Sequence, residues 1–303
     1  MRKFKKLVVL EPVRFDKAAE EALFEYAENV RIYRDIPPDD AEKIRRMKDA
    51  EAVLVFYTSQ ISAQVIEACK DLRYIGMCCS LYTPASANVD ISYARGKGIT
   101  VTGIRKYGDQ GVPEFISSEL VRLFHGFGPR RWREEEMELT GVKLGIVGMG
   151  DVGTAVAELM LAFQMDVYYF SRTRKPGIED KGARYLPFHR LLETVDVLTT
   201  HLHKNTVIMA ENDFKRFGMG KVLINTTFTP PYPLDALKGW LQQPGNYYIV
   251  DSAVSIGGKE GEIYQMPNVI CPDVIAGQSV LSGVLLRKKV LQNIEEYLSS
   301  QVF

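Results

Sequence analysis

The chain has 303 residues, in which 38 Lys and Arg balance 38 Asp and Glu, so its formal net charge is zero. A neutral chain has no overall field that attracts nucleic acid or an anionic membrane surface, and we expect neither as a partner. The length is sufficient for two domains, each with a sizeable hydrophobic core.

The first residues and the cysteines indicate a reducing compartment. The N-terminal run has a basic flank, but Glu11 and Pro12 cut its apolar stretch too short for a signal peptide. No other stretch approaches the apolar length of a membrane span. The cysteines include an adjacent pair and lack zinc-finger spacing; they are Cys69, Cys78, Cys79 and Cys271. We therefore expect a cytoplasmic protein with free thiols and no metal site.

Short apolar runs alternate with helical patterns from the N-terminus onward. The runs predict strands at Leu7–Leu10, Val30–Tyr33, Ala52–Phe56, Tyr74–Cys78 and Thr100–Gly103. This alternation predicts an open parallel sheet with helices on both faces. A helical pattern from Pro113 to about His125, followed by a charged passage at residues 129–136, indicates the edge of a domain.

A second series of the same kind follows the charged passage. It predicts strands at Leu144–Val147, Asp166–Phe170, Val195–Thr199, Val222–Asn225 and Tyr248–Val250. The last helical pattern, residues 279–299, has no strand after it, and we expect it to return to the first domain. The predicted domains are therefore residues 1–104 with 279–303, and residues 105–278.

Residues 143–165 contain the most informative motif of the chain. A strand pattern ends at Val147, the sequence Gly148-Met149-Gly150-Asp151-Val152-Gly153 follows, and a helical pattern comes next. This is the context in which GxGxxG binds a dinucleotide; the alternative is an ordinary turn between strand and helix. Gly148 allows the tight turn, Gly150 lets the backbone approach a pyrophosphate, and Gly153 lets the helix pack on the strand. The first helical turn, with Asp151 and Val152, offers N–H groups to the phosphates.

The end of the next predicted strand indicates which dinucleotide binds. An NAD site normally places Asp or Glu about 20 residues beyond the glycines, where it binds the ribose 2′-hydroxyl. Here Ser171, Arg172 and Thr173 occupy that position. A hydroxyl and a guanidinium bind a 2′-phosphate by charge-assisted hydrogen bonds, whereas a carboxylate repels it. We therefore expect NADP(H) in preference to NAD(H); the alternative is a solvated basic turn.

The order of motifs resembles the D-isomer-specific 2-hydroxyacid dehydrogenases, which include formate and glycerate dehydrogenases and glyoxylate and hydroxypyruvate reductases. The resemblance covers nearly the whole chain and rests on residues 88–90, 98–101, 112–114, 191–202, 223–226, 251, 267–270 and 275–278. It implies an α/β fold of two doubly wound parallel-sheet domains, a flavodoxin-like outer domain that binds substrate and a Rossmann cofactor domain. It also implies that His201, Thr226, Asp251 and Gly277 lie beside the cofactor.

The same resemblance exposes a change in the catalytic set. The family uses an Arg to hold the substrate carboxylate, a His to move the proton, and a Glu to orient that His. In this chain the corresponding residues are Phe228, Asp273 and Val254. A shifted alignment does not restore the set, because no Arg occurs between Arg216 and Arg287. Since 2-oxoacid reduction needs a carboxylate clamp and a proton near neutral pH, we expect the family's ordinary reaction to be lost.

The residues that replace the catalytic set are unknown from sequence, and the candidates are Asp273, Lys106 and His203. Asp273 donates a proton only if its pKa is strongly raised. Lys106 lies in Arg105-Lys106-Tyr107, where the family has its hinge; the alternative is a pair of solvated loop cations. His203 follows a predicted strand at the ligand-binding edge, and contact with the cofactor is its alternative role. Tyr82, in an expanded loop at residues 80–87, is a further candidate.

Two functions remain open at this level. The first is an NADP(H)-dependent oxidoreductase of altered chemistry, acting on a carbonyl or other electron-poor substrate that is not a simple 2-oxoacid. The alternative is a catalytically silent protein that binds NADP(H) and acts through a partner. In either case we expect a small-molecule ligand in the cleft between the domains, and a homodimer, because symmetric pairs dominate among oligomers.

Overall fold

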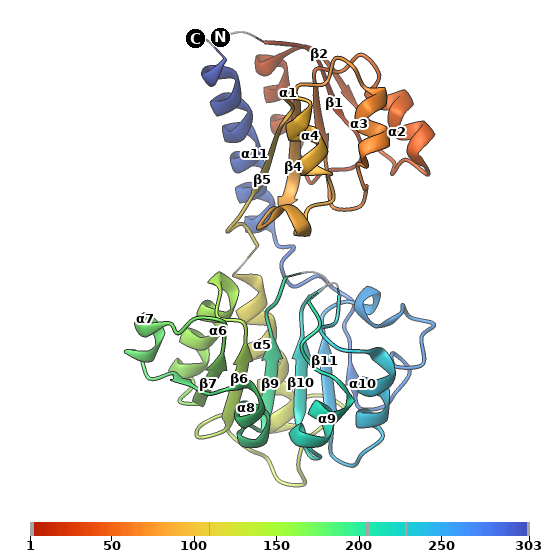
Figure 1. The fold of residues 1–303 in the computed structure, drawn as a ribbon. Coiled ribbons are helices and arrows are strands. Elements are labelled where there is room, and N and C mark those ends of the chain that lie inside the picture. Colours follow the sequence, from red (N-terminus) through yellow and green to blue (C-terminus); the bar gives the residue numbers. More distant parts are fainter. Residues whose placement is uncertain (1–2, 109, 204–205, 228, 302–303) are drawn as a thin grey trace. The chain divides into compact units, whose positions relative to one another are not determined.

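The computed structural model describes residues 3–108, 110–203, 206–227 and 229–301. These residues form two compact units, each with its own parallel sheet (Figure 1). The first unit comprises residues 1–107 and 280–303, and the second comprises residues 108–279. The predicted α/β class with two parallel sheets is confirmed.

The first unit has a five-stranded sheet with the order β2-β1-β3-β4-β5. Its strands are β1 (Phe4–Val9), β2 (Ala27–Ile32), β3 (Ala52–Val55), β4 (Tyr74–Ser80) and β5 (Thr100–Ile104), and all pairs are parallel. This is the flavodoxin-like order, in which the winding reverses between β1 and β3. The connecting helices are α1 (Lys17–Tyr26), α2 (Asp40–Met47), α3 (Ala63–Ala68), η1 (Pro84–Ser86) and α4 (Ile91–Gly96).

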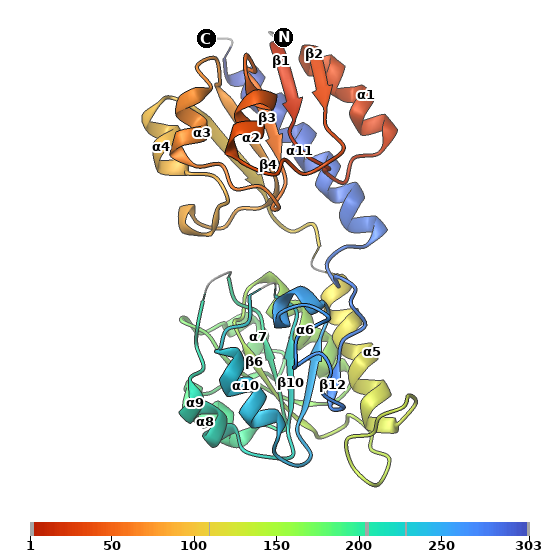
Figure 2. The ribbon, with the colours of Figure 1, turned by 90° about the vertical axis from the view of Figure 1, so that its right-hand side faces the viewer.

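The last helix, α11 (Val280–Ser300), belongs to this first unit. The second unit, residues 108–279, lies between the two parts of the first unit in the sequence. Helix α11 packs against β4, β5 and α1. Figure 2 shows it along one face of the sheet. Its buried residues Leu286, Val290 and Ile294 recur every four positions and form a single apolar stripe. Because the stripe covers one face of the sheet, the two ends of the chain share one hydrophobic core.

The second unit has a seven-stranded parallel sheet with the order β12-β11-β10-β9-β6-β7-β8. The strands are β6 (Lys143–Val147), β7 (Asp166–Phe170), β8 (Arg184–Tyr185), β9 (Val197–Thr200), β10 (Val222–Asn225), β11 (Tyr247–Val250) and β12 (Val269–Ile270). This is the Rossmann order, extended by one strand, and the winding reverses between β6 and β9. The sequence did not predict the edge strands β8 and β12, because each has only two residues and two residues are too few to show a period.

Helices cover both faces of this sheet (Figure 1). They are α5 (Gly111–His125), α6 (Asp151–Ala162), α7 (Pro176–Glu179), α8 (Phe188–Thr194), α9 (Glu211–Phe217), α10 (Leu234–Leu241) and η2 (Ala253–Ile256). One core contains side chains of α5 and α6, and another contains side chains of α8, α9 and α10. Strand residues alternate between them: Val222 and Ile224 enter the first core and Leu223 the second. Successive side chains of a strand point to opposite faces of the sheet, and both faces are covered by apolar cores. The strands therefore consist of continuous hydrophobic runs.

Within the described parts of the chain, no helix combines the length and the apolar character needed to span a bilayer.

The packing of α11 predicts a large loss of stability from one truncation. Leu286 is fully buried, so Leu286→Ala should lower the free energy of unfolding of the first unit by about 2–5 kcal/mol. Leu281, on the same helix, is 51% exposed, so Leu281→Ala should change the free energy of unfolding by less than about 0.5 kcal/mol. Urea unfolding, with hydrogen exchange in β4 and β5, measures both. Equal effects of the two variants would contradict the packing of α11 on this sheet.

Candidate cofactor site

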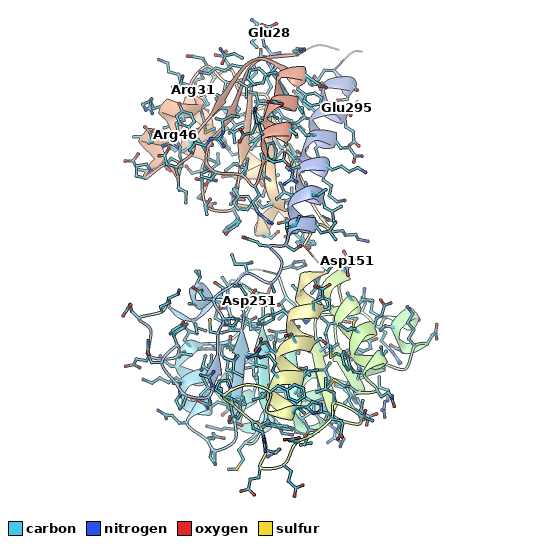
Figure 3. All side chains as sticks on the ribbon, turned by 180° about the vertical axis from the view of Figure 1, so that it is seen from behind. Glu28, Arg31, Arg46, Asp151, Asp251 and Glu295 are labelled. Atoms are coloured by element: carbon cyan, nitrogen blue, oxygen red, sulfur yellow. The ribbon has the colours of Figure 1, made fainter. Side chains whose placement is uncertain are left out.

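Five of the residues expected at the cofactor lie directly after five parallel strands. Gly148 follows β6, Ser171 follows β7, His201 follows β9, Thr226 follows β10 and Asp251 follows β11. Parallel strands end at one edge of a sheet, so these residues form a single row at that edge. Figure 3 shows Asp251 and Asp151, at the start of α6, at this edge. Ligands of such sheets bind where the winding reverses, which here is between β6 and β9.

The glycine turn is fixed by close backbone contacts. Gly148 has φ +97°, and a Cβ on it would lie 2.2 Å from the carbonyl oxygen of His201. A Cβ on Gly153 would lie 2.0 Å from the carbonyl oxygen of Gly148. The backbone of His201 also donates a hydrogen bond to the carbonyl of Val147 at 2.8 Å. These contacts leave no room for a side chain at Gly148 or Gly153, so both glycines set the geometry of the turn.

Gly150 differs from its neighbours because it faces open space. It is the N-cap of α6, its φ is −86°, and a Cβ on it would have no atom within 4 Å. Gly150, as the N-cap residue, has no side chain to cap this end of α6. The first N–H groups of a helix have no partner inside the helix, and the helix dipole places positive charge there. The turn therefore fits a pyrophosphate. Asp151 and Val152 lie on the first turn, Asp151 exposed and Val152 half-buried.

The turn after β7 carries an unpaired guanidinium. Arg172 is exposed and has no hydrogen bond or ion pair with any described residue, whereas the Arg174 guanidinium donates to Glu179 at 3.1 Å. The hydroxyl of Ser171 donates a hydrogen bond to the carbonyl of the exposed Thr173. A phosphate that binds the Ser171 hydroxyl therefore has to replace this bond. The turn thus fits a 2′-phosphate through Arg172, with Ser171 engaged inside the turn.

His201, next to the glycine turn, is held as a neutral ring. Its Nε2 lies 3.1 Å from the hydroxyl of Thr199. Part of the residue remains accessible to solvent, but the surrounding protein lowers the imidazole pKa to about 4 through burial. The ring is therefore uncharged near pH 7 and does not serve as a general acid there.

A buried amide fixes the end of β10. Asn225 accepts a hydrogen bond from the Thr200 hydroxyl at 3.1 Å and donates from Nδ2 to the carbonyl of Thr227 at 3.0 Å. The two bonds join the ends of β9 and β10 and shape the turn that carries the half-buried Thr226.

Asp251 has a structural task that the sequence does not reveal. The residue is 4% exposed, and its Oδ2 accepts a hydrogen bond from the backbone N–H of Ala276 at 3.0 Å. Its carbonyl accepts a second bond from the N–H of Val274 at 2.7 Å. Burial raises the pKa of the carboxyl above its ordinary value, and these backbone donors oppose the shift. Asp251 thus ties the segment that contains Gly277 to the end of β11.

Two further glycines let that segment approach α5. A Cβ on Gly108 would lie 2.6 Å from the carbonyl oxygen of Gly277, and one on Gly111 would lie 2.1 Å from that of Ala276. Gly108 and Gly111 belong to no sequence motif, because the need for glycine there arises only from contact with a segment far away in sequence.

The positions of the family's catalytic set hold a different arrangement. Phe228 lies outside the described residues. Val254, in η2, is 70% exposed. The Asp273 carboxylate pairs with the Lys259 ammonium at 2.7 Å and accepts the N–H of Ala253 at 2.9 Å. The Lys259 ammonium, with this backbone bond, lowers the pKa of Asp273 below its ordinary value. An ionised Asp273 accepts hydrogen bonds and supplies no proton, which weighs against it as the catalytic acid.

The remaining candidates are divided between the units. Lys106 and Tyr82 belong to the first unit, and His203, which is exposed, belongs to the second. Arg105 binds the expanded loop: its guanidinium donates to the carbonyls of Leu81 and Tyr82 at 2.7 and 2.8 Å. This cation therefore holds a loop in place. Sequence reasoning missed Lys259, because its pairing with Asp273 arises only in the folded chain.

No group of three or more His, Cys, Asp or Glu that could hold a metal ion occurs among the residues whose structure is described.

Comparisons with known proteins agree with this geometry. Residues 124–271 match the sequence profile of the D-isomer specific 2-hydroxyacid dehydrogenase NAD binding domain. A Staphylococcus aureus (strain MRSA252) protein named as a 2-hydroxyacid dehydrogenase is 32% identical over 206 residues, which make up 62% of this chain and 63% of that protein.

Solved structures share the fold over nearly the whole chain. An acyclic imino acid reductase in complex with NADPH and D-Arg superposes with a TM-score of 0.83 at 22% identity and covers 97% of both chains. A 2-hydroxyacid dehydrogenase from Ketogulonicigenium vulgare Y25 has a TM-score of 0.82 at 18% identity and covers 99% of this chain and 96% of its own. Over these residues the chain is similar to the D-isomer-specific 2-hydroxyacid dehydrogenases and to their NAD-binding domain.

Proposed function

We propose that the protein is an NADP(H)-dependent reductase of an electron-poor C=O or C=N bond and does not act on simple 2-oxoacids. The observation that carries this proposal is the coexistence of two features at one sheet edge. A glycine turn with room at Gly150 and a free guanidinium at Arg172 fits the cofactor. An ionised Asp273 stands where the family has its proton-donating His.

The cofactor preference follows from charge at the end of β7. The 2′-phosphate of NADP(H) needs a cation, and Arg172 has no competing partner among the described residues. No carboxylate stands at Ser171–Thr173 to bind the 2′-hydroxyl of NAD(H) or to repel the phosphate. When bound, the nicotinamide supplies a hydride. The chain binds and orients it through the row of residues at the strand ends.

The proton side of the reaction favours an acceptor that needs no strong acid. Reduction of a neutral carbonyl leaves an alkoxide that must be protonated, and His201, with its pKa near 4, is a neutral ring at pH 7. A protonated imine already carries its proton on nitrogen. The structural neighbour named as an acyclic imino acid reductase, solved with NADPH and D-Arg, supports C=N reduction on this fold.

A second function remains compatible with the same site. The protein binds NADP(H) without turnover and passes its occupancy to a partner. Oxidation of NADPH in the presence of a panel of ketones, aldehydes and imines separates the two: a substrate-dependent fall in absorbance supports the reductase, and binding without turnover across the panel supports the silent protein.

The first prediction from this proposal concerns the choice of cofactor. NADPH should bind more tightly than NADH, because a charge-assisted bond from Arg172 to the 2′-phosphate is worth about 1.5–3 kcal/mol before desolvation. Arg172→Ala should remove this preference and leave NADH binding unchanged. Arg184→Ala is the control, since that cation is already paired with Asp166. Fluorescence titration with both cofactors measures the effect; tighter NADH binding by the unaltered chain would refute the preference.

The second prediction separates folding from cofactor binding at the glycine turn. Gly150→Ala should leave the stability of the second unit nearly unchanged, because its Cβ meets open space, yet weaken NADPH binding by filling the pyrophosphate site. Gly148→Ala should destabilise the unit itself, because its Cβ would lie 2.2 Å from the His201 carbonyl oxygen at φ +97°. Thermal unfolding and NADPH titration of both variants give the result. Unimpaired NADPH binding by Gly150→Ala would argue against this turn as the phosphate site.

The third prediction concerns the family's usual substrates. Pyruvate, glyoxylate and hydroxypyruvate should be reduced negligibly with NADPH, since loss of the general acid alone costs roughly 10²–10⁴-fold. Restoring one residue should not help, because members of a catalytic unit act together. The triple change Phe228→Arg, Val254→Glu and Asp273→His should regain measurable 2-oxoacid reduction. Rapid turnover of any of these acids by the unaltered chain would show that other groups have taken over the missing roles.

A further inference from the structure

The ion pair between Asp273 and Lys259 joins a fixed partner to a movable one. Asp273 is anchored: one carboxylate oxygen accepts the Ala253 N–H at 2.9 Å, and the next residue, Val274, donates to the Asp251 carbonyl at 2.7 Å. Its φ of +55° is left-handed, a conformation maintained by these backbone bonds. The carboxylate therefore keeps its place whether or not the lysine is present.

Lys259 is attached differently. Its side chain is 61% exposed, against 26% for Asp273, and it follows Gly257 and Gly258, both with φ +87°. The Lys259 carbonyl accepts a hydrogen bond from the Gln265 amide at 2.9 Å, which holds the backbone while the four-carbon stem stays unrestrained. Its ammonium lies 2.7 Å from Asp273 Oδ2, so it can leave without disturbing the other oxygen.

We propose that Asp273 is the recognition site for a positively charged substrate nitrogen, and that Lys259 is an internal cation which the substrate displaces. The inference rests on the proposed reductase function and names its substrate class: iminium cations with an apolar skeleton. Two exposed apolar side chains follow the residues of the Ala253–Asp273 hydrogen bond in sequence. They are Val254, which is 70% exposed, and Val274, which is 55% exposed. They offer apolar contact to the carbon part of such a cation.

The chemical step balances without an acid from the protein. A hydride with its electron pair passes from the reduced nicotinamide to the iminium carbon, and the C=N π pair becomes the lone pair of the amine nitrogen. The nitrogen keeps the proton and substituents it brought, and the nicotinamide is oxidised. Asp273 takes no proton in this step; it holds the cation before transfer and loses its attraction as the nitrogen becomes neutral. A 2-oxoacid carboxylate is repelled by the same charge.

The competing interpretation is an ordinary surface ion pair, which contributes little and binds nothing. The two interpretations differ in the effect of removing the lysine. If Lys259 occupies a binding site, its loss strengthens the binding of an external cation. If the pair only stabilises the loop, its loss leaves ligand binding unchanged.

Calorimetric titration of the full chain with pyrrolidinium, and with neutral cyclopentanol of similar size, tests the proposal in the presence and absence of NADPH. The unaltered chain should bind pyrrolidinium roughly tenfold more tightly than cyclopentanol, the worth of one charge-assisted bond. Asp273→Asn should abolish that preference; Asn is chosen because it tolerates a left-handed φ. Lys259→Met should tighten pyrrolidinium binding roughly two- to fivefold, as expected for removal of an exposed pair.

Lys238→Met is the matched control, because Lys238 forms a comparable exposed pair with Glu262 in the same unit. It should leave pyrrolidinium binding unchanged. Equal affinity for both probes, or no gain from Lys259→Met, overturns the proposal. NADPH titration of each variant separates the inference on Asp273 from the proposed reductase function. Normal NADPH binding without a preference for the cation contradicts only the inference on Asp273. Failure of the unaltered chain to bind NADPH contradicts the proposed function.

Discussion

The geometry of the site depends on one steric constraint, the contact between Gly148 and the backbone of His201. β6 and β9 are neighbours in the sheet although about fifty residues separate them, and Val147 pairs with Thr200 at the point where the winding reverses. A side chain at position 148 would meet the His201 carbonyl oxygen at 2.2 Å. The absence of that side chain lets β6 turn immediately into α6. As a result the helix N-terminus lies at the sheet edge, beside the ends of the other strands.

The same edge has two electrostatic regions with opposite preferences. Near β7, the exposed Arg172 presents positive charge without a partner among the described residues, which suits a phosphate. Near β11 and β12, the ionised Asp273 presents negative charge that the Lys259 ammonium neutralises. Asp251 between them is buried and bound to a backbone N–H, so it contributes to structure rather than to ligand charge. A ligand with an anionic end and a cationic or electron-poor end matches this order.

Most of the architecture could be predicted from sequence because strands and helices have different periods. Ten strands were predicted from apolar runs, and their ends agree with the structure or differ from it by one to three residues. Thr200, for example, is fully buried and completes β9, although its hydroxyl gave no apolar signal. β8 and β12 escaped, since each has two residues and exists only because a neighbouring strand provides hydrogen-bond partners.

The sequence by itself determined the resemblance to the 2-hydroxyacid dehydrogenases, the α/β class and the glycine turn, because these depend on local spacing and on which residue types are present. It also determined that no imidazole stands at the family's catalytic position. Only the tertiary structure decided what the substituted residues do. Asp273 could have been a protonated acid or an ionised anion, and that depends on Lys259, fourteen residues away, and on the Ala253 N–H. Asp251 and Gly111 likewise owe their roles to the segment around Ala276, and such contacts between distant segments leave no periodic signal in the chain.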